Sequence, residues 1–159
     1  ALKVTHVLLT HGHFDHIGGV AALQAAGATV GCSQTEEALA LGKDNMAAQF
    51  GAYVPAFRGD FTFRGGETLE LCGMRLLVIA TPGHTAGSVC FLADGKLFTG
   101  DTLFAGSVGR TDLPTGSGAQ LTASVKALYA LEGDFPVYPG HGEDTTLGYE
   151  RCNNGWIRC

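Results

Sequence analysis

The feature that most constrains the fold is the segment Thr10–Gly19, which holds three of the chain's six histidines together with an aspartate. A mostly apolar, β-branched run, Val4–Leu9, comes directly before it and is typical of a buried strand. Imidazole and carboxylate groups are costly to crowd together unless a shared ion organises them, and both are ligands of divalent metals. The segment therefore predicts a metal site at the end of a buried strand.

The same arrangement recurs three times along the chain. A short apolar run, typical of a strand, precedes each of His84, Asp101 and His141. Because ligands in open sheets collect beyond the strand ends, where loops converge, we expect four loops to meet at one point. The candidate metal ligands in these loops are His11, His13, Asp15, His16, His84, Asp101 and His141.

Seven ligands are too many for one tetrahedral zinc ion, but they suit two ions that share a carboxylate. Alternate residues of an extended loop point the same way, so His11 and His13 can serve one ion while Asp15 and His16 serve the other. His84 and His141 then complete the two sets, and Asp101 can bridge them. No member of the set is a cysteine, which favours an exchangeable site over a closed structural one.

The charge of such a site favours hydrolysis. Two divalent ions bring four positive charges, and two aspartates and a bridging hydroxide subtract three, which leaves one. Bound cations lower the pKa of water from about 15.7 toward about 7, so hydroxide is available at neutral pH. The remaining positive charge can stabilise an oxyanion as it forms.

The first part of the chain alternates between strand and helix patterns and predicts a parallel α/β portion. A helix is expected over Ile17–Ala26, closed by Gly27, and a strand over Ala28–Cys32. Ser33–Glu36 has the capping-box pattern and predicts the start of a helix that Gly42 weakens and Gly51 stops.

The remainder predicts an antiparallel sheet with a late helix. Turns at Cys72-Gly73 and Asp94-Gly95 separate paired strand patterns, and the second is a strong hairpin signal. A capping box at Ser117–Gln120 opens an amphipathic helix, and Val137–Tyr138 reads as a last strand. His6 lies outside the ligand pattern and is expected to be a hydrogen-bonded strand histidine.

Length and composition predict one domain over residues 1–159, with 45% hydrophobic residues to build its core. A net charge of −5 without a basic stripe disfavours nucleic-acid binding, and no apolar run approaches the ~18 residues that a membrane span needs. Five irregularly spaced cysteines predict no disulfide framework. We expect Cys32 and Cys90 to be buried, Cys152 and Cys159 to be free thiols, and the chain to be cytoplasmic.

Four motifs, in order, resemble the metallo-β-lactamase fold superfamily: H-G-H-F-D-H from His11, T-P-G-H-T-A-G-S from Thr81, Gly100-Asp101, and Pro139-Gly-His-Gly142. The segment T-G-D-T-L-F-A-G-S-V-G-R-T-D-L-P from Thr99 and the tail L-G-Y-E-R-C-N-N from Leu147 narrow the resemblance to short, single-domain glyoxalase II-like (hydroxyacylglutathione hydrolase-like) enzymes. The resemblance implies a four-layer αββα sandwich of mixed α and β structure and two divalent metal ions: zinc, with iron or manganese as alternatives.

The resemblance also implies a role for each ligand. His11, His13 and His84 match the ligands of one metal, and Asp15, His16 and His141 match those of the other. Asp101 matches the bridge, and Asp15 can also shuttle a proton, so these two aspartates are the candidate catalytic residues. The β-lactamases of the superfamily generally carry a cysteine at the position of Asp101, which argues against that activity here.

The superfamily places opening strands and a helix before the strand that leads to H-x-H-x-D-H. Here that strand begins within the first few residues, so we expect the opening strands of the first half to be missing and the chain to be N-terminally truncated. We also expect the chain to lack the C-terminal helical domain with which glyoxalase II enzymes hold glutathione. An unpaired sheet edge would favour self-association into a homo-oligomer.

The leading functional hypothesis is hydrolysis of a small thioester of the S-lactoylglutathione kind by attack of a metal-bridging hydroxide. The alternatives are a persulfide dioxygenase, with one iron held by His11, His84 and Asp101, and an inactive metal-binding fragment. Arg110 and Asp112 either orient the substrate or form a local ion pair. Thr85 and Ser88 either hydrogen-bond to the ligands or cap a turn.

Overall fold

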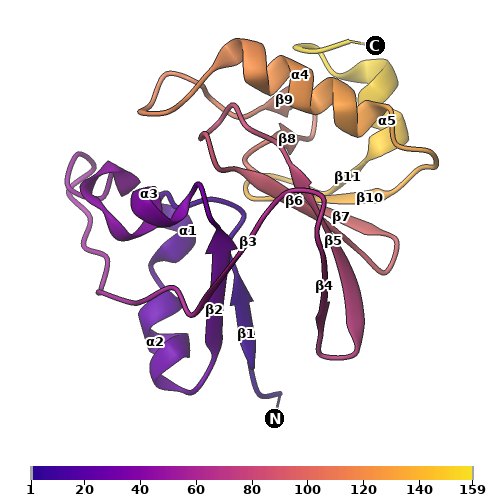
Figure 1. Cartoon of the computed structure of the whole chain (residues 1–159). Helices are drawn as coiled ribbons and strands as arrows, with labels where there is room; N and C mark the ends of the chain where they lie inside the picture. The colour runs from indigo at the N-terminus through magenta and orange to yellow at the C-terminus, as the bar shows by residue number, and fades with distance from the viewer. Residues whose placement is uncertain (1, 159) are drawn as a thin grey trace.

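The computed structural model describes residues 2–158, in which two sheets face each other and helices cover both outer sides (Figure 1). Phe63, Val78 and Phe91 form a buried cluster between the sheets, joined by Leu8 and Phe61 of the smaller one. Helices α1–α3 lie on one outer side and α4 and α5 on the other. The predicted αββα architecture is therefore confirmed.

The smaller sheet is parallel, as the alternating sequence pattern predicted. Its strands are β1 (His6–Leu8), β2 (Thr29–Ser33) and β3 (Phe61–Phe63), in that order. Among the described residues β1 pairs with β2 alone, and Val4 beside it is exposed. Self-association through this edge stays a prediction.

The larger sheet has the order β11-β10-β7-β6-β5-β4. Its strands are β4 (Thr68–Leu71), β5 (Met74–Ala80), β6 (Val89–Ala93), β7 (Lys96–Gly100), β10 (Pro136–Pro139) and β11 (Thr145–Thr146). Both residues of each two-residue turn, Cys72-Gly73 and Asp94-Gly95, have positive φ, as tight hairpin turns require. Both predicted hairpins are confirmed.

Strand directions in this sheet place three loops at one edge. β6 runs antiparallel to both β5 and β7, and β10 runs parallel to β7. Strands β5, β7 and β10 therefore run in the same direction, and their carboxyl ends lie at the same edge. A two-stranded ribbon, β8 (Leu103–Phe104) with β9 (Ser107–Val108), follows β7.

The helix α4 (Gly118–Tyr129) begins where the capping box predicted, since the Ser117 hydroxyl accepts a hydrogen bond from the Gln120 amide at 3.4 Å. Leu121, Val125 and Leu128 recur at helical spacing and are buried against the larger sheet together with α5 (Leu147–Asn153). This face forms the largest buried apolar cluster and supports the strands that lead to the ligand loops.

The predicted helix over residues 17–26 is wrong in its bounds. Helix α1 (Phe14–Ile17) begins earlier, and Gly18 and Gly19 separate it from α2 (Val20–Ala25). Asp15 and His16 therefore lie on a helical turn rather than in an extended loop, and only His11 and His13 precede it.

The capping box predicted at Ser33–Glu36 is confirmed for Ser33 and wrong for the Glu36 side chain. The Ser33 hydroxyl does accept the Glu36 amide at 3.2 Å, but the Glu36 side chain binds elsewhere. The helix α3 (Glu37–Leu41) stops at Gly42, and a 3₁₀ turn, η1 (Lys43–Asn45), follows.

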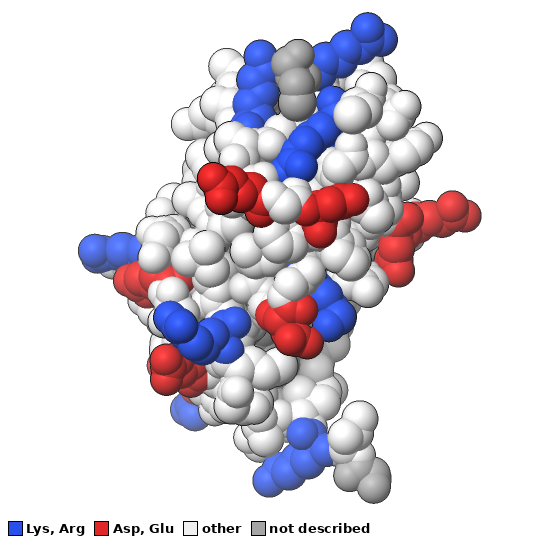
Figure 2. Space-filling model, turned by 90° about the vertical axis from the view of Figure 1, so that its right-hand side faces the viewer, with Lys and Arg blue, Asp and Glu red and all other residues white. Residues whose placement is uncertain are grey.

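No helix among the described residues is long and apolar enough to cross a membrane. On the face shown in Figure 2, acidic and basic side chains are interspersed over the middle of the molecule, and basic ones gather near the top. The expectation that the chain binds no nucleic acid stays a prediction.

The cysteines divide by burial. Cys32 and Cys90 are buried as predicted, while Cys72 and Cys152 are exposed free thiols. The fifth, Cys159, lies outside the described residues.

Burial raises the pKa of the Cys32 and Cys90 thiols to about 11, so little thiolate forms at pH 8. We expect brief iodoacetamide treatment of the folded protein at pH 8 to label Cys72 and Cys152 and to spare Cys32 and Cys90. Peptide mapping by mass spectrometry measures the labelling, with urea-unfolded protein as the control in which all four react. Equal labelling of Cys90 in the folded protein would contradict this burial.

Leu128→Ala should lower the free energy of unfolding by about 2–5 kcal/mol, because it opens a cavity in the cluster under α4. Urea denaturation with an unchanged m-value measures the loss. Leu23→Ala on α2, where the side chain is partly exposed, is the matched control and should cost about 1 kcal/mol or less. Equal losses in the two variants would show that α4 does not anchor the core.

Candidate metal centre

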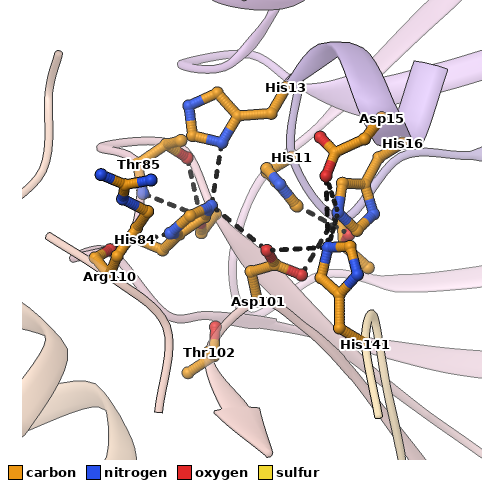
Figure 3. A network of polar contacts seen from close by, with 12 residues as sticks. His11, His13, Asp15, His16, His84, Thr85, Asp101, Thr102, Arg110 and His141 are labelled. Atoms are coloured by element: carbon orange, nitrogen blue, oxygen red, sulfur yellow. Dashed lines mark hydrogen bonds and ion pairs between the residues drawn. The ribbon is translucent and has the colours of Figure 1, made fainter. Parts of the chain in front are cut away.

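All seven predicted ligands meet at one edge of the two sheets (Figure 3). His11 and His13 follow β1, and Asp15 and His16 lie on the helical turn α1 beside them. The other three come from the larger sheet, where His84, Asp101 and His141 follow β5, β7 and β10. The common direction of those three strands brings residues that are far apart in the sequence into one cluster.

Three buried histidines, His11, His13 and His84, form the first group, with one ring nitrogen from each within 4.8 Å of the others. His13 Nδ1 lies 2.8 Å from His84 Nε2. On its other side, His84 Nδ1 is 2.8 Å from the carbonyl oxygen of Arg110. A carbonyl only accepts, so His84 Nδ1 carries a proton, and in the neutral ring Nε2 offers its lone pair to the cluster.

Asp15, His16 and His141 form the second group, which is more exposed than the first. His16 Nε2 and His141 Nε2 are 3.1 Å apart, and the Asp15 Oδ2 carboxylate oxygen is 3.2 Å from His141 Nε2. Ligand atoms of His11, His16 and Asp101 also lie within 4.8 Å of one another, so the two groups adjoin. The assignment of each residue to one of two ions, which the family resemblance implied, stays a prediction.

The Asp101 carboxylate lies between the two groups (Figure 3). Its Oδ2 oxygen is 3.6 Å from His84 Nε2 in the first group and 3.5 Å from His141 Nε2 in the second. Its Oδ1 oxygen is 3.3 Å from His16 Nε2. One carboxylate thus faces ligand atoms of both groups.

Burial and mutual repulsion keep the first group neutral. Burial, with His16 and His84 nearby, lowers the pKa of His11 well below its usual value, and burial with His84 lowers the pKa of His13 to about 4. Burial also lowers the pKa of His84. Neutral imidazoles have a free lone pair, the state that a cation requires.

The pKa of His16 shifts in the opposite direction from those of the buried histidines. Burial lowers the pKa of His16, but the hydrogen bond and the charge of Asp101 outweigh it, and the net shift is upward. Burial in turn would raise the pKa of Asp101, but the hydrogen bond from His16 holds it below its usual value. The set holds two carboxylates and five imidazoles, and no lysine or arginine is among the seven residues. Carboxylate oxygens and imidazole nitrogens are donors that fit divalent cations.

Two unpartnered buried atoms support this fit. His11 Nε2 and His13 Nε2 have no hydrogen-bond partner among the described residues, although both side chains are at most 3% exposed. Buried polar atoms are rarely left unpaired, and exceptions need a physical reason. A cation bound to His11 would supply that reason, since the His11 ring centroid lies 4.1 Å from that of His16 and 4.7 Å from that of His84.

A cavity of about 450 Å³ opens beside the ligands. Much of its wall is apolar: Phe14, Met46, Phe50, Phe104, Val108 and Leu113. Phe14 and Phe50 stack with ring centroids 5.2 Å apart. Sequence reasoning missed this wall, because its residues come singly from short helices, short strands and loops and form no periodic pattern.

The residues around the ligands bear on two open alternatives, and a role of Arg110, which lines the cavity, in orienting a substrate stays a prediction. Arg110 binds Asp112 through two contacts of 2.7 Å, so the local ion pair is confirmed, and it is the Arg110 carbonyl that contacts His84. Ser88 caps the turn by accepting the Thr85 amide at 3.1 Å. Sequence reasoning missed the Arg110 carbonyl, since a backbone atom leaves no trace in the residue pattern.

His6 lies in β1, outside the cluster, with Nδ1 3.1 Å from the Thr5 hydroxyl, as predicted. Glu36, read from the sequence as a cap, instead reaches the loops that carry His13 and His84. The only sequence signal for it was the capping-box pattern, which assigns its carboxylate to the wrong partner.

The lowered pKa of His13 has a consequence for the stability of the metal-free protein. Between its usual value of 6.5 and about 4, His13 is neutral when folded and protonated when unfolded, so the unfolded chain binds more protons. We expect the urea midpoint of metal-free protein to fall as the pH is lowered through this window. His13→Gln should show a shallower fall, and an equal slope in the two proteins would contradict the shift.

The comparisons with known proteins agree with this site. The family described as "Metallo-beta-lactamase superfamily" matches residues 1–142. Hydroxyacylglutathione hydrolase GloC of Haemophilus influenzae is 37% identical over 163 residues, which cover 98% of this chain and 77% of that protein.

Three solved structures are similar over nearly the whole chain. The B3 metallo-beta-lactamase BLEG-1 is 33% identical with a TM-score of 0.90, covering 98% of this chain and 78% of its own. TTHA1623 in a di-iron-bound form is 38% identical with a TM-score of 0.85, and the match covers 96% of this chain and 77% of that one. ETHE1 from Myxococcus xanthus is 32% identical with a TM-score of 0.79, and the match covers 97% of this chain and 63% of that one.

The family match spans far more than half of the chain, and relatives above 30% identity extend over almost all of it. Together with the αββα layers and the histidine and aspartate cluster at their edge, this shows that the chain belongs to the metallo-beta-lactamase superfamily.

Proposed function

We propose that this chain is a metal-dependent hydrolase that cleaves small thioesters and holds two divalent ions. The observation that carries the proposal is the pair of three-residue ligand groups with the Asp101 carboxylate between them. His11, His13 and His84 would hold one ion, Asp15, His16 and His141 the other, and Asp101 both. Zinc is the first candidate, and the di-iron form of TTHA1623 supports iron as the alternative, with manganese after it.

Two divalent ions at this site would polarise a carbonyl group and lower the pKa of water toward about 7. The chain's own residues supply orientation. His84 is fixed by the donation of its Nδ1–H to the Arg110 carbonyl, a contact of the kind that orients metal-ligating histidines. Asp101 is held ionised by the neighbouring histidines, which keeps its two oxygens available to both groups.

Asp15 is placed to handle protons. Its side chain is partly exposed and faces the cavity, with Oδ2 3.2 Å from His141 Nε2. Thiolates are good leaving groups, so cleavage of a thioester demands no strong general acid. Asp15 would therefore take up and pass on the proton released when water attacks the carbonyl carbon.

The cavity supports a substrate of low mass. Its volume of about 450 Å³ lies in the range of small-molecule sites, and its apolar wall can hold the acyl chain. The similarity to GloC supports a 2-hydroxyacyl thioester of glutathione as the first substrate to test. The free thiols Cys32, Cys72, Cys90 and Cys152 support a reducing compartment, the cytoplasm.

The second candidate is a persulfide dioxygenase with one iron held by His11, His84 and Asp101. The structural likeness to ETHE1 supports it. It assigns no role to the second group, however, whose three ligand atoms also lie within 4.8 Å of one another. The thioester hydrolase uses both groups and is therefore the better account.

Metal stoichiometry and turnover together test the proposal. Protein purified without chelators should retain two metal ions per chain, measured by inductively coupled plasma mass spectrometry. The same protein should hydrolyse S-lactoylglutathione. The panel includes acetyl thioesters, glutathione persulfide with an oxygen electrode, and a chromogenic cephalosporin. One iron with oxygen uptake would support the dioxygenase, and metal without any turnover would support an inactive fragment.

Asp15→Asn should lower kcat for the thioester by about 10²–10⁴-fold, the usual contribution of a positioned proton-transfer group. His6→Gln is the matched control, because His6 is a histidine of β1 outside the ligand cluster. It should retain wild-type kcat. Loss of activity in both variants, or in neither, would contradict the assignment of Asp15.

A further inference from the structure

The Glu36 carboxylate is buried between two ligand loops, and none of its partners belongs to its own helix. The side chain is 1% exposed. Its Oε1 accepts the Gly12 amide at 2.9 Å, while Oε2 accepts the Thr85 hydroxyl at 2.9 Å and the Gly87 amide at 3.0 Å. Gly12 stands between His11 and His13, and Thr85 directly follows His84.

The contact is tight as well as polar. A Cβ added to Gly87 would lie 2.5 Å from the Glu36 carboxylate, and one added to Gly12 would lie 2.6 Å from Ala40 of α3. Glycine at these two positions lets one loop approach Glu36, directly before α3, and the other approach Ala40 near the end of that helix. Helix α3 therefore packs closely against both ligand loops.

The protonation state of Glu36 follows from these donors. Burial raises the pKa of the Glu36 carboxyl, and the Gly12, Thr85 and Gly87 donors oppose the shift. Both carboxylate oxygens accept hydrogen bonds, which favours the ionised form and makes the bonds charge-assisted, so each is stronger than a neutral one. A carboxylate accepts hydrogen bonds at both of its terminal atoms, whereas the amide of a glutamine accepts at one and donates at the other.

We propose that Glu36 is a positioning residue that sets the separation of the His11–His13 loop from His84, and thereby the metal affinity of the three-histidine group. The inference rests on the metal site of the proposed function. The 2.8 Å contact between His13 Nδ1 and His84 Nε2 spans the same two loops that Glu36 joins. Movement of either loop therefore changes the position of a ligand.

A second buried glutamate provides a matched control. Glu150 is 0% exposed and also accepts three hydrogen bonds, from the Gly106 amide, the Thr145 hydroxyl and the Asn154 side chain. None of these partners lies in the loops that carry His11, His13 or His84. Glu150→Gln therefore measures what a buried carboxylate contributes to stability alone.

The test compares zinc affinity in backgrounds that keep one ligand group complete. In a His141→Asn background the three-histidine group is whole, and addition of Glu36→Gln should weaken zinc binding about 10–100-fold in chelator competition. In a His84→Asn background the same change should alter zinc binding of the second group by less than about threefold. Glu150→Gln in the His141→Asn background should also stay within about threefold.

Amide hydrogen exchange gives a readout that needs no metal. In metal-free Glu36→Gln protein, an amide N–H of the new side chain must face a backbone donor, so we expect exchange at Gly12 or Gly87 to rise about tenfold or more. The core amides of α4 should be unchanged. Thr85→Val keeps the carboxylate and removes one donor, so it should give a smaller loss of zinc affinity with less risk to folding.

The outcomes separate the inference from the function beneath it. If wild-type protein binds two zinc ions and Glu36→Gln lowers stability without selective loss at the three-histidine group, Glu36 is merely structural and the inference is overturned. If Glu150→Gln weakens that group equally, the inference is overturned as well. If wild-type protein binds no zinc, iron or manganese, the proposed metal site fails, and this role for Glu36 fails with it.

Discussion

The common direction of β5, β7 and β10 is the constraint on which the site depends. Each of these strands ends directly before one ligand loop, so His84, Asp101 and His141 leave the larger sheet at a single edge. The parallel smaller sheet delivers His11 and His13 to the same place from β1. Packing of the two sheets through Phe63, Val78 and Phe91 therefore also fixes the distance between the halves of the cluster.

Without cations the cluster of histidines and aspartates lowers the stability of the folded protein. Burial of the apolar clusters on either side offsets this cost. Three buried histidines are held neutral by desolvation, while Asp101 is held ionised beside them. Buried groups forced away from their solution protonation states cost free energy of folding, which the apolar clusters under α4 and α1–α2 must offset. Bound ions would accept the lone pairs of the neutral imidazoles and attract the Asp101 carboxylate, so stability and metal content should rise together.

The sequence predicted most of this arrangement because the deciding signals were local. Asp94-Gly95 defines its hairpin within two residues, and the ligand residues stand directly after their strands. The predictions that were wrong concern a helix that is divided in two and a side chain whose partners lie far away in the sequence. Gly18-Gly19 divides a helix that composition alone predicted to be continuous, and the S-x-x-E pattern at Ser33 cannot reveal that Glu36 binds residues 24 and 51 positions away.

The Phe14–Phe50 stack joins a residue of the ligand-bearing helix α1 to the segment that forms part of the cavity wall. Every proposed ligand comes from the end of a strand or from α1, whereas Met46 and Phe50 belong to the irregular segment between η1 and β3, and that segment supplies no ligand. Exchange of this one stretch between relatives would replace part of the cavity wall and leave the ligand cluster in place. Diversification of substrate range and retention of chemistry can therefore proceed independently, through insertion or recombination at a single surface segment.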